Sequence, residues 1–395
     1  MDIGIDTIDF YIPKTVLAAE ELAQARGASL DKYLNGLGIK KIAILPPDED
    51  IVTMAANAAE GALEGVNKSE IDMLLFATES AVDQSKSAGM WLHQLLGLPS
   101  RCRVVELKQA CYGATAAIQM ASAMVQKNSQ SKVLVIASDV SRYELNSPGE
   151  PTAGAGAVAM VIAKDPRVLR LEPKTGFYAE DVMDFWRPNY KSEAVVDGKL
   201  SIRKYVKVIL ESFRQYQDQT GLTLKDHSYF GYHIPYPRLA EKTHKMLFFE
   251  NGIELTSEEV SEQLKTFLEL PRLVGNSYTA SLYMGLLSLL YNAKEDLSGH
   301  RIGLYSYGSG CMGEYFSGVV SSQYKSQIKP DLYKKRIEDR RALTIDEYEA
   351  FFRFNYPREM GEFHLPSYNN GVYRLDKIKN HIRLYKKREE PLNRG

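Results

Sequence analysis

The chain has 395 residues, of which 44% are hydrophobic and 25% charged, and its formal net charge is -1. This size and composition are typical of a globular protein with a large buried core and about two or three domains. The near-zero net charge excludes a general electrostatic attraction to nucleic acid or anionic membranes, so an anionic ligand must be held by a local basic group.

The first residues, MDIGIDTIDFYIP, are acidic where a signal peptide is basic, and the chain contains no apolar run of about 18 residues. Its three cysteines, Cys102, Cys111 and Cys311, are an odd number without CxxC spacing. A disulfide framework or zinc site is therefore not expected, and a reducing cytoplasm is the expected location. Any special cysteine would act as a thiol.

Continuous apolar runs bounded by polar turns alternate with segments of helical periodicity. Such alternation predicts an α/β fold whose strands are buried on both faces. In chain order, we expect a helix at 51–63, a strand at 73–78, helices at 87–96 and 112–125, strands at 133–138 and 157–163, a helix at 204–219, a strand at 229–234, a helix at 278–292 and a strand at 302–307.

Two of these helices, 112–125 and 278–292, carry apolar or small residues on all sides. A helix without a polar face is normally surrounded by protein, and its small residues allow close approach of another backbone. We therefore expect the two helices to pack against each other between sheets.

The order of elements repeats along the chain. Glu79 follows a strand, and 32 residues later (111 − 79) Cys111 precedes one apolar helix; His233 ends a strand, and 43 residues later (276 − 233) Asn276 precedes the other. The four residues should therefore occupy equivalent positions in two halves and face one cleft at the carboxyl ends of the strands.

This repeat predicts a division of the chain into three parts. The N-terminal half covers 1–165 and the C-terminal half 166–330. The remainder, 331–395, is rich in Lys, Arg, Tyr and Glu, and we expect a peripheral, mostly helical extension with a frayed end from 386 onward.

Each candidate side chain has a functional and a purely structural explanation. A helix N-terminus would lower the pKa of Cys111, although most buried cysteines are packed core thiols. Desolvation would raise the pKa of Glu79 toward a value suited to proton transfer, unless the carboxyl lies in solvent. His233 precedes two prolines at a loop mouth, and Asn276 could be only a helix cap.

Residues 308–313, GSGCMG, match the pattern GxGxxG. The following EYFSGVVSS has the character of a strand and not of a phosphate-facing helix, so a dinucleotide site is not expected. The glycines could instead direct backbone N–H groups at an oxyanion, or simply form a tight hairpin. We interpret Cys102 and Cys311 as structural residues.

Eight motifs give the chain a specific resemblance. DIVTMAANAA, ATESAVD, KQACYGAT, SRYELNSPGEPTAGAGAVAM, DVMDFWRP, YHIPYP, VGNSYTASLY and YSYGSG occur in order between the N-terminus and EYFSGVV. With them the chain resembles bacterial 3-hydroxy-3-methylglutaryl-CoA (HMG-CoA) synthases, which are condensing enzymes of the thiolase fold. The resemblance implies a five-layered α-β-α-β-α sandwich with central buried helices.

The resemblance also implies roles for individual residues. Cys111 would be the nucleophile, Glu79 the general acid/base, and His233 the group facing acetoacetyl-CoA. The implied reaction condenses acetyl-CoA with acetoacetyl-CoA through an acetyl-cysteine in the mevalonate pathway, without cofactor or metal, in a homodimer. Further implied substrate-binding residues are Asn276, Tyr143, Asp184 and Ser309, the last together with Cys111 through backbone amides of an oxyanion hole.

The remaining assignments have alternatives. Arg238, Lys242 and Lys245 follow His233 at helical spacing and could bind the CoA phosphates, or could be solvated surface charges. The basic run 333–341 is interpreted as a surface helix. The resemblance leaves open a condensing enzyme that acts on carrier-protein-bound β-ketoacyl chains in polyketide assembly. A non-catalytic acyl-CoA-binding protein of the same fold is a third possibility, which the complete Cys111, Glu79 and His233 set disfavours.

Overall fold

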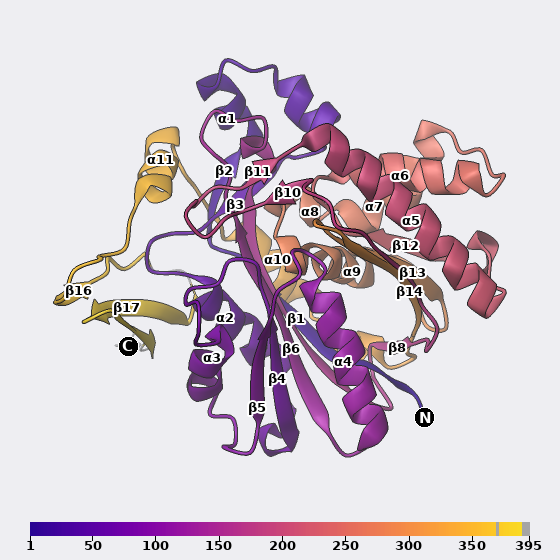
Figure 1. Ribbon diagram of the computed structural model, residues 1–395, viewed down its shortest axis with the longest axis horizontal. Coiled ribbons are helices and arrows are strands. Elements are labelled where there is room, and N and C mark those ends of the chain that lie inside the picture. The colour runs from indigo at the N-terminus through magenta and orange to yellow at the C-terminus, as the bar shows by residue number, and fades with distance from the viewer. Residues whose placement is uncertain (369–370, 389–395) are drawn as a thin grey trace.

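The computed structural model describes residues 1–368 and 371–388, and its centre is one continuous path of hydrogen-bonded strands (Figure 1). The smaller β9 (Gly176–Ala179) pairs with β14 beside this path. The order of the path is β12 (Tyr229–Tyr232), β13 (Arg301–Gly308), β14 (Met312–Val320), β8 (Leu169–Leu171), β1 (Ile3–Tyr11), β7 (Gly154–Lys164), β6 (Lys132–Ser141), β4 (Ile71–Ala77) and β5 (Arg103–Leu107).

Three smaller sheets and a set of helices surround this path. None of the helices in the described part of the chain is both long and apolar enough to cross a bilayer. The small sheets are β10 (Phe185–Trp186) with β11 (Val195–Val196), β15 (Arg341–Ala342) with β2 (Thr15–Ala18) and β3 (Lys41–Ile44), and β16 (Glu362–His364) with β17 (Tyr373–Lys379) and β18 (Ile382–Lys387). The helices are α1 (Ala19–Ala25), α2 (Ile51–Ala62), α3 (Ala88–Leu96), α4 (Gly113–Lys127), α5 (Gly198–Thr220), α6 (Pro237–Glu250), α7 (Ser257–Leu268), α8 (Pro271–Val274), α9 (Ser281–Asn292), α10 (Pro330–Glu338) and α11 (Ile345–Arg353).

The predicted repeat of architecture is present. Strand β4 lies parallel to β6, which is followed by antiparallel β7; likewise β12 lies parallel to β13, which is followed by antiparallel β14. Glu79 and His233 come just after β4 and β12, and Cys111 and Asn276 come just before α4 and the short turn that leads into α9. The four residues therefore occupy equivalent positions in the two halves, as the spacing predicts.

The helices form layers around the strands. Helices α2 and α3 cover one face of the first-half strands and α4 the other (Figure 1). In the second half, successive side chains of β13 point to opposite faces: the Tyr305 ring packs on Tyr205 of α5, while Leu304 and Phe267 of α7 both lie against Gly231 of β12. Helix α9 contacts β1 of the first half and β12 and β13 of the second, so it lies between the two sets of strands.

Only one of the two apolar helices is buried on all sides. Every residue of α9 from Ser281 to Leu290 is buried, as predicted. Helix α4 does contact α9, since the hydroxyl oxygens of Thr115 and Tyr283 are 2.6 Å apart, but its outer face is open and Met120 is 51% exposed. The prediction of complete burial is therefore wrong for α4, because composition does not determine how many neighbours a helix receives.

The C-terminal extension differs from its prediction. Helices α10 and α11 are present, and the basic run 333–341 forms most of α10, but β16, β17 and β18 form a sheet. Arg383 and Tyr385 of β18 both bind Asp50, whose carboxylate caps the N-terminus of α2. Of the end predicted to fray, residues 386–388 are ordered beside the core, and residues 389–395 lie outside the described residues.

Candidate active site

The thiol of Cys111 and the carboxyl group of Glu79 are in direct contact. The Cys111 Sγ–H donates to Glu79 Oε1 over 3.0 Å, although the residues are 32 positions apart. Strand β4 delivers Glu79 at its carboxyl end, beside the turn that precedes α4, because β4 is paired in parallel with both β5 and β6. A single small acyl group on the sulfur would be within reach of this carboxyl.

The turns leading to the site contain strained backbone. Ala110, directly before Cys111, has a φ of 44°, and Tyr278, at the start of the turn before α9, has a φ of 46°. Left-handed backbone at a residue other than glycine costs about 1 kcal/mol or more, and is retained where the surroundings enforce it. Each of the two turns that carry functional side chains therefore contains left-handed backbone at a residue other than glycine, although the two positions are not equivalent.

Burial dominates the protonation of the pair. It raises the pKa of Glu79 to about 8, helped by the charge of Asp139 and opposed by Cys111 and Arg187. Burial also raises the pKa of the Cys111 thiol well above its usual value, and the carboxyl of Glu79 raises it further. The expected lowering of the Cys111 pKa by the start of α4 is therefore wrong, because desolvation and nearby carboxyls outweigh the helix amides.

Asp139 is an important residue that sequence analysis missed. Its buried carboxylate accepts hydrogen bonds from the Thr78 hydroxyl at 2.8 Å, the Glu79 amide at 2.9 Å and the Thr279 amide at 3.1 Å. It therefore joins the end of β4 to the start of α9. The available signal was an acid at the end of the apolar strand VLVIASD, the same signal that identified Glu79.

His233 is held as a neutral ring. Its Nδ1 lies 2.7 Å from the Ser281 hydroxyl, its backbone N–H donates to Tyr305 O at 2.7 Å, and burial lowers its pKa to about 3. The hydroxyl of Tyr205 donates to the carbonyl of His233 at 2.5 Å. Because a negative charge on Cys111 would raise the pKa of Tyr205, this tyrosine connects the His233 side of the site with the nucleophile.

Asn276 and Tyr143 both adjoin Tyr278. The Asn276 Oδ1 accepts a hydrogen bond from the backbone N–H of Tyr278 at 2.9 Å. The side chain of Asn276 therefore also stabilises the turn before α9, which is the structural explanation considered for it above. Burial raises the pKa of Tyr143 to about 12, and the charge of Cys111 adds to that effect. Tyr143 and Tyr278 both pack against Phe185.

Asp184 organises the glycine turn between β13 and β14. Its carboxylate accepts from the Tyr307 hydroxyl at 2.8 Å and from the Gly310 amide at 2.9 Å. A side chain at Gly308 would lie 2.5 Å from the carbonyl oxygen of Gln109, so glycine permits this turn to approach the nucleophile turn. The strand expected after the glycine motif is present as β14. The oxyanion role of Ser309 stays a prediction.

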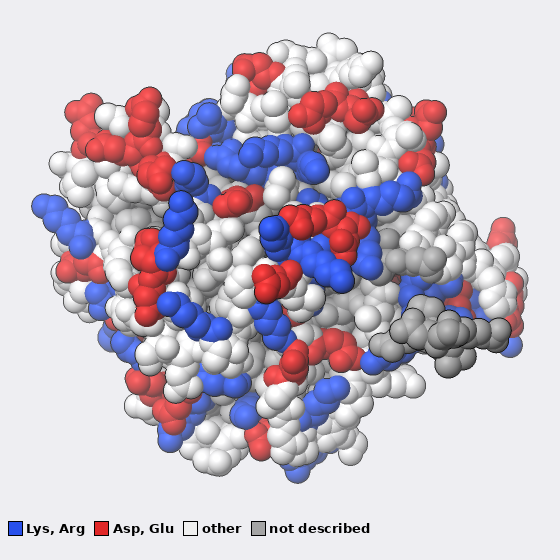
Figure 2. Space-filling model, turned by 180° about the vertical axis from the view of Figure 1, so that it is seen from behind, with Lys and Arg blue, Asp and Glu red and all other residues white. Residues whose placement is uncertain are grey.

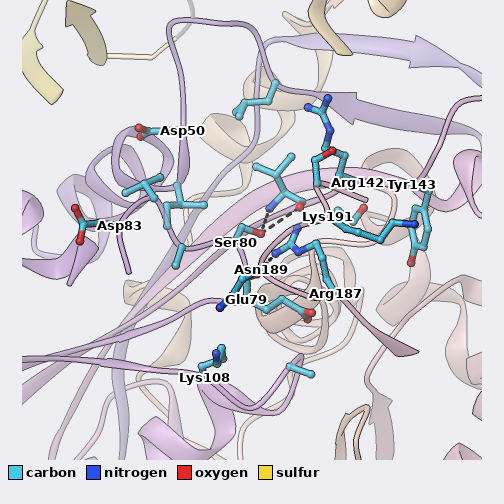
Figure 3. A pocket seen from close by; sticks show the side chains of 18 of the residues that line it. Asp50, Glu79, Ser80, Asp83, Lys108, Arg142, Tyr143, Arg187, Asn189 and Lys191 are labelled. Carbon is cyan, nitrogen blue, oxygen red and sulfur yellow. Dashed lines mark hydrogen bonds between the residues drawn. The ribbon is translucent and has the colours of Figure 1, made fainter. Parts of the chain in front are cut away.

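A cavity of about 1440 Å³ reaches Glu79 (Figure 3). It is lined by parts of both halves and of the C-terminal extension, including Tyr143, Ser309 and Tyr356. Its basic lining residues are Lys86, Lys108, Arg142, Arg187, Lys191 and Arg383.

The basic residues expected to bind CoA phosphates do not line this cavity. Arg238 of α6 is engaged by the Glu241 carboxylate and donates to the carbonyl of Asn35 at 2.7 Å. Lys242 and Lys245 are exposed on the same helix. Their assignment to CoA stays a prediction.

The chain is similar to known proteins along most of its length. The N-terminal family model of hydroxymethylglutaryl-coenzyme A synthase matches residues 1–167, and the C-terminal model of the same family matches 171–254 and 250–388. The hydroxymethylglutaryl-CoA synthase of Enterococcus faecalis is 40% identical over 352 residues, which cover 89% of this chain and 92% of that protein.

A second relative and a solved structure are also similar to this chain. A Bacillus subtilis polyketide biosynthesis 3-hydroxy-3-methylglutaryl-ACP synthase is 33% identical over 374 residues, covering 89% of this chain and 88% of that protein. A crystal structure of HMG-CoA synthase complexed with CoA superimposes with a TM-score of 0.92 at 38% identity, covering 98% of this chain and all of the other. The chain therefore belongs to the hydroxymethylglutaryl-CoA synthase family, a group of acyl-condensing enzymes with a thiolase-like fold.

Proposed function

We propose that this protein condenses acetyl-CoA with acetoacetyl-CoA and water to HMG-CoA and CoA, the HMG-CoA-forming step of isoprenoid synthesis by the mevalonate pathway. The observation that carries the proposal is the 3.0 Å contact between the Cys111 thiol and the Glu79 carboxyl at the edge of a large cavity. Membership of this family supports a reaction that makes a hydroxymethylglutaryl thioester, because the relatives named above form such thioesters or bind CoA.

In the first step, the sulfur of Cys111 attacks the thioester carbonyl of acetyl-CoA. The bond from the acetyl carbon to the CoA sulfur breaks, and the thiol proton of Cys111 passes to the departing CoA thiolate. The exchange of one thioester for another has little net energy cost. Backbone amides at Cys111 and Ser309 would stabilise the oxyanion that forms during transfer.

In the second step, the Glu79 carboxylate removes a proton from the methyl group of acetyl-Cys111. The resulting enol or enolate attacks the ketone carbon of acetoacetyl-CoA. Exclusion of water protects the carbon nucleophile, and the apolar surroundings that raise the pKa of Glu79 also make its ionised form a stronger base.

The Nε2–H of His233 would polarise the ketone oxygen as the new bond forms, and the proton that Glu79 removed from the methyl group would then neutralise the resulting alkoxide. If the Ser281 hydroxyl donates to Nδ1, the neutral ring carries its proton on Nε2, where it can donate to the substrate. Water then cleaves the thioester to Cys111. Sulfur recovers a proton, and the released end of the product becomes a carboxylate.

Incubation with acetyl-CoA, followed by peptide mass spectrometry, tests the proposal directly. We expect an acetyl group on Cys111, and its conversion to HMG-CoA after acetoacetyl-CoA is added.

Glu79→Gln should still form the acetyl-Cys111 adduct but fail to condense it with acetoacetyl-CoA. His233→Ala should also form it and use acetoacetyl-CoA poorly. Equal loss of acetylation in both variants would show that these roles are wrong, and absence of any adduct on the wild-type protein would favour a non-catalytic acyl-CoA-binding protein.

A second candidate acceptor is a β-ketoacyl chain on a carrier protein, as the name of the Bacillus subtilis relative suggests. The two acceptors can be separated by kcat/KM measured with acetoacetyl-CoA and with acetoacetyl carrier protein. We expect free acetoacetyl-CoA to be preferred. The same assay on Arg238→Ala, Lys242→Ala and Lys245→Ala tests whether these side chains contribute to CoA binding through a raised KM.

We also propose a homodimer and a cytoplasmic location. Strand β5 is the last strand of the sheet path and exposes Val105 at 42%, and the open face of neighbouring α4 exposes Met120 at 51%. An exposed edge strand with apolar neighbours suits pairing with a second copy. Light scattering should give twice the 44.5 kDa chain mass, and Val105→Lys should reduce it. Three unpaired thiols suit a reducing compartment.

A further inference from the structure

We propose that Arg187 binds the carboxylate that is released when the thioester on Cys111 is hydrolysed. The inference rests on the proposed function and extends it. Arg187, which lines the cavity, would bind the carboxylate of the product. None of the substrates has this carboxylate.

The interior around the nucleophile is rich in carboxyl groups. Negative charges on Glu79, Asp139 and Asp184 each raise the pKa of the Cys111 thiol. A further carboxylate formed at this sulfur would be both desolvated and repelled, and such a charge is costly unless a cation faces it.

Arg187 is suitably placed to face that charge. It directly follows β10, and its guanidinium donates to the backbone carbonyl of Glu79. Its positive charge lowers the pKa of both Glu79 and Tyr278, so it acts on the centre of the site and not only on its rim. Figure 3 shows Arg187 beside Glu79 at the cavity wall.

The guanidinium of Arg187 has N–H groups that are available to bind a ligand. It carries five N–H groups, one of which is used by the Glu79 carbonyl, and no Asp or Glu forms an ion pair with it among residues 1–368 and 371–388. A planar guanidinium binds a carboxylate through two parallel hydrogen bonds more effectively than an ammonium group can. Arg187 therefore has the charge and the geometry that the new carboxylate requires.

Other cations continue the positive lining away from the reaction centre. Lys108 and Lys191 line the same cavity, and neither forms an ion pair with a carboxylate in the described part of the chain, although the charge of Lys108 acts to lower the pKa of Glu106. The same cavity is also lined by Asp50, Glu79, Asp83 and Glu106, so its six cations leave only a small local excess of positive charge. On the molecular face drawn in Figure 2, basic and acidic side chains likewise lie intermixed.

The hydrolysis step balances without another reactant. The oxygen of water bonds to the thioester carbon, the carbon–sulfur bond breaks, and Cys111 regains a proton. The acid that forms then loses its proton to solvent, because a carboxyl group is ionised at neutral pH when a cation stabilises it. By favouring this ionised product, Arg187 would favour hydrolysis over return of the acyl group to sulfur.

The test compares two ligands that differ only in the carboxylate. HMG-CoA carries it, and 3-hydroxy-3-methylbutyryl-CoA has a hydrogen in its place. Dissociation constants are measured by calorimetry for the wild-type protein, Arg187→Gln and Arg187→Lys. The matched control is Lys86→Gln, which removes a cation from the same cavity whose ammonium group lies 3.9 Å from the centre of the Trp91 ring.

We expect Arg187→Gln to weaken HMG-CoA binding at least about tenfold while leaving the analogue within about twofold, the effect of losing one charge-assisted carboxylate contact. Arg187→Lys should retain part of the preference, and Lys86→Gln all of it. In single turnovers, acetyl-Cys111 should form normally in Arg187→Gln, whereas release of the condensed product from sulfur should slow.

Equal weakening of both ligands would overturn the inference and make Arg187 a brace for the loop at Glu79. If Arg187→Gln fails to fold, as judged by thermal melting, the same comparison in Arg187→Lys decides the matter: a loss shared equally by both ligands overturns the inference. If the wild-type protein forms no acetyl-Cys111, the proposed function itself fails, which is a distinguishable result.

Discussion

At the scale of single residues, the chemistry depends on the protons held by Cys111, Glu79 and His233. The first two lie in direct contact and are both made harder to ionise by burial, whereas burial keeps His233 neutral. Burial therefore favours the uncharged form of these three groups at neutral pH, and it makes the Cys111 thiolate and the Glu79 carboxylate more reactive when they form.

The pKa of Glu79 predicts the pH dependence of condensation. Only the ionised carboxylate removes the methyl proton, so the rate should rise about tenfold per pH unit at low pH and level off above about 8. Rapid-quench measurement on preformed acetyl-enzyme isolates this step. A rate that is flat between pH 6 and 8 would argue against Glu79 as the base.

The same pKa predicts a change in stability. A raised pKa means that the folded protein binds the proton more tightly than the unfolded chain does, so the contribution of Glu79 to stability is lost as pH rises from about 4.5 to about 8. Glu79→Gln should therefore be more stable than the wild type above pH 8 and show a flatter profile. Urea unfolding across this pH range measures the effect.

Ser281→Ala tests the tautomer of His233. If the Ser281 hydroxyl donates to Nδ1, its removal takes away the group that directs the ring proton to Nε2. We expect condensation to slow about tenfold, while acetylation of Cys111 is unchanged. Ser281→Thr, which keeps a hydroxyl, is the conservative control. Equal slowing of acetylation in the alanine variant would show a general structural defect instead.

At the scale of elements, a buried contact joins the nucleophile helix to the hairpin that carries the glycine turn. Glu314 of β14 is 3% exposed and accepts hydrogen bonds from the Tyr112 hydroxyl at 2.7 Å and the Gln119 amide at 3.0 Å. Tyr112 directly follows Cys111. The contact therefore sets how the sulfur lies relative to Ser309, whose carbonyl accepts from Gln109 at 3.4 Å.

Tyr112→Phe should disturb this alignment more than it disturbs stability. The change removes one hydroxyl and leaves a buried carboxyl with one fewer donor, so the acetylation rate should fall about tenfold with unfolding free energy reduced by about 1–3 kcal/mol. Tyr283→Phe is the matched control, because it removes a buried hydroxyl that contacts the same helix at Thr115. If both variants acetylate equally fast, the contact has no positioning role.

At the scale of the whole molecule, the C-terminal extension is part of the core structure and not an appendage. The proposed halves meet between β7 and β8, and β18 of the extension returns to the first half at Asp50. The extension also supplies Tyr356 and Arg383 to the wall of the cavity. Its folding and the shape of the site are therefore coupled.

Arg383→Met should lower stability substantially. The guanidinium bonds Asp50 Oδ2 at 3.0 Å, and the two side chains are only 16% and 7% exposed. Removing one member of a buried ion pair leaves the other charge unpaired, at a cost of about 3–5 kcal/mol. Urea unfolding measures this loss, and Lys386→Met, on the same strand but more exposed, should change stability by less than about 1 kcal/mol. Similar losses in both would contradict the coupling.

The amino-acid sequence by itself determined the main strands and helices of residues 51–307 and their order. The apolar runs 73–78 and 133–138, bounded by polar turns, form the parallel strands β4 and β6. Glu79 follows the first of these strands directly in sequence, and Cys111 directly precedes a helix, so both are features that the local sequence shows. The repeated spacing then placed Glu79 and Cys111 on the same side of the sheet, so their meeting was predictable.

Only the tertiary structure decided what those groups experience. Desolvation and charge depend on every neighbour within several ångströms, so the raised pKa of Cys111, the bridging role of Asp139 and the position of Arg187 could not be obtained from residues close in sequence. The exposed face of α4 and the contact of β18 with Asp50 also depend on packing between segments that are far apart in sequence. A local sequence pattern does not contain this information.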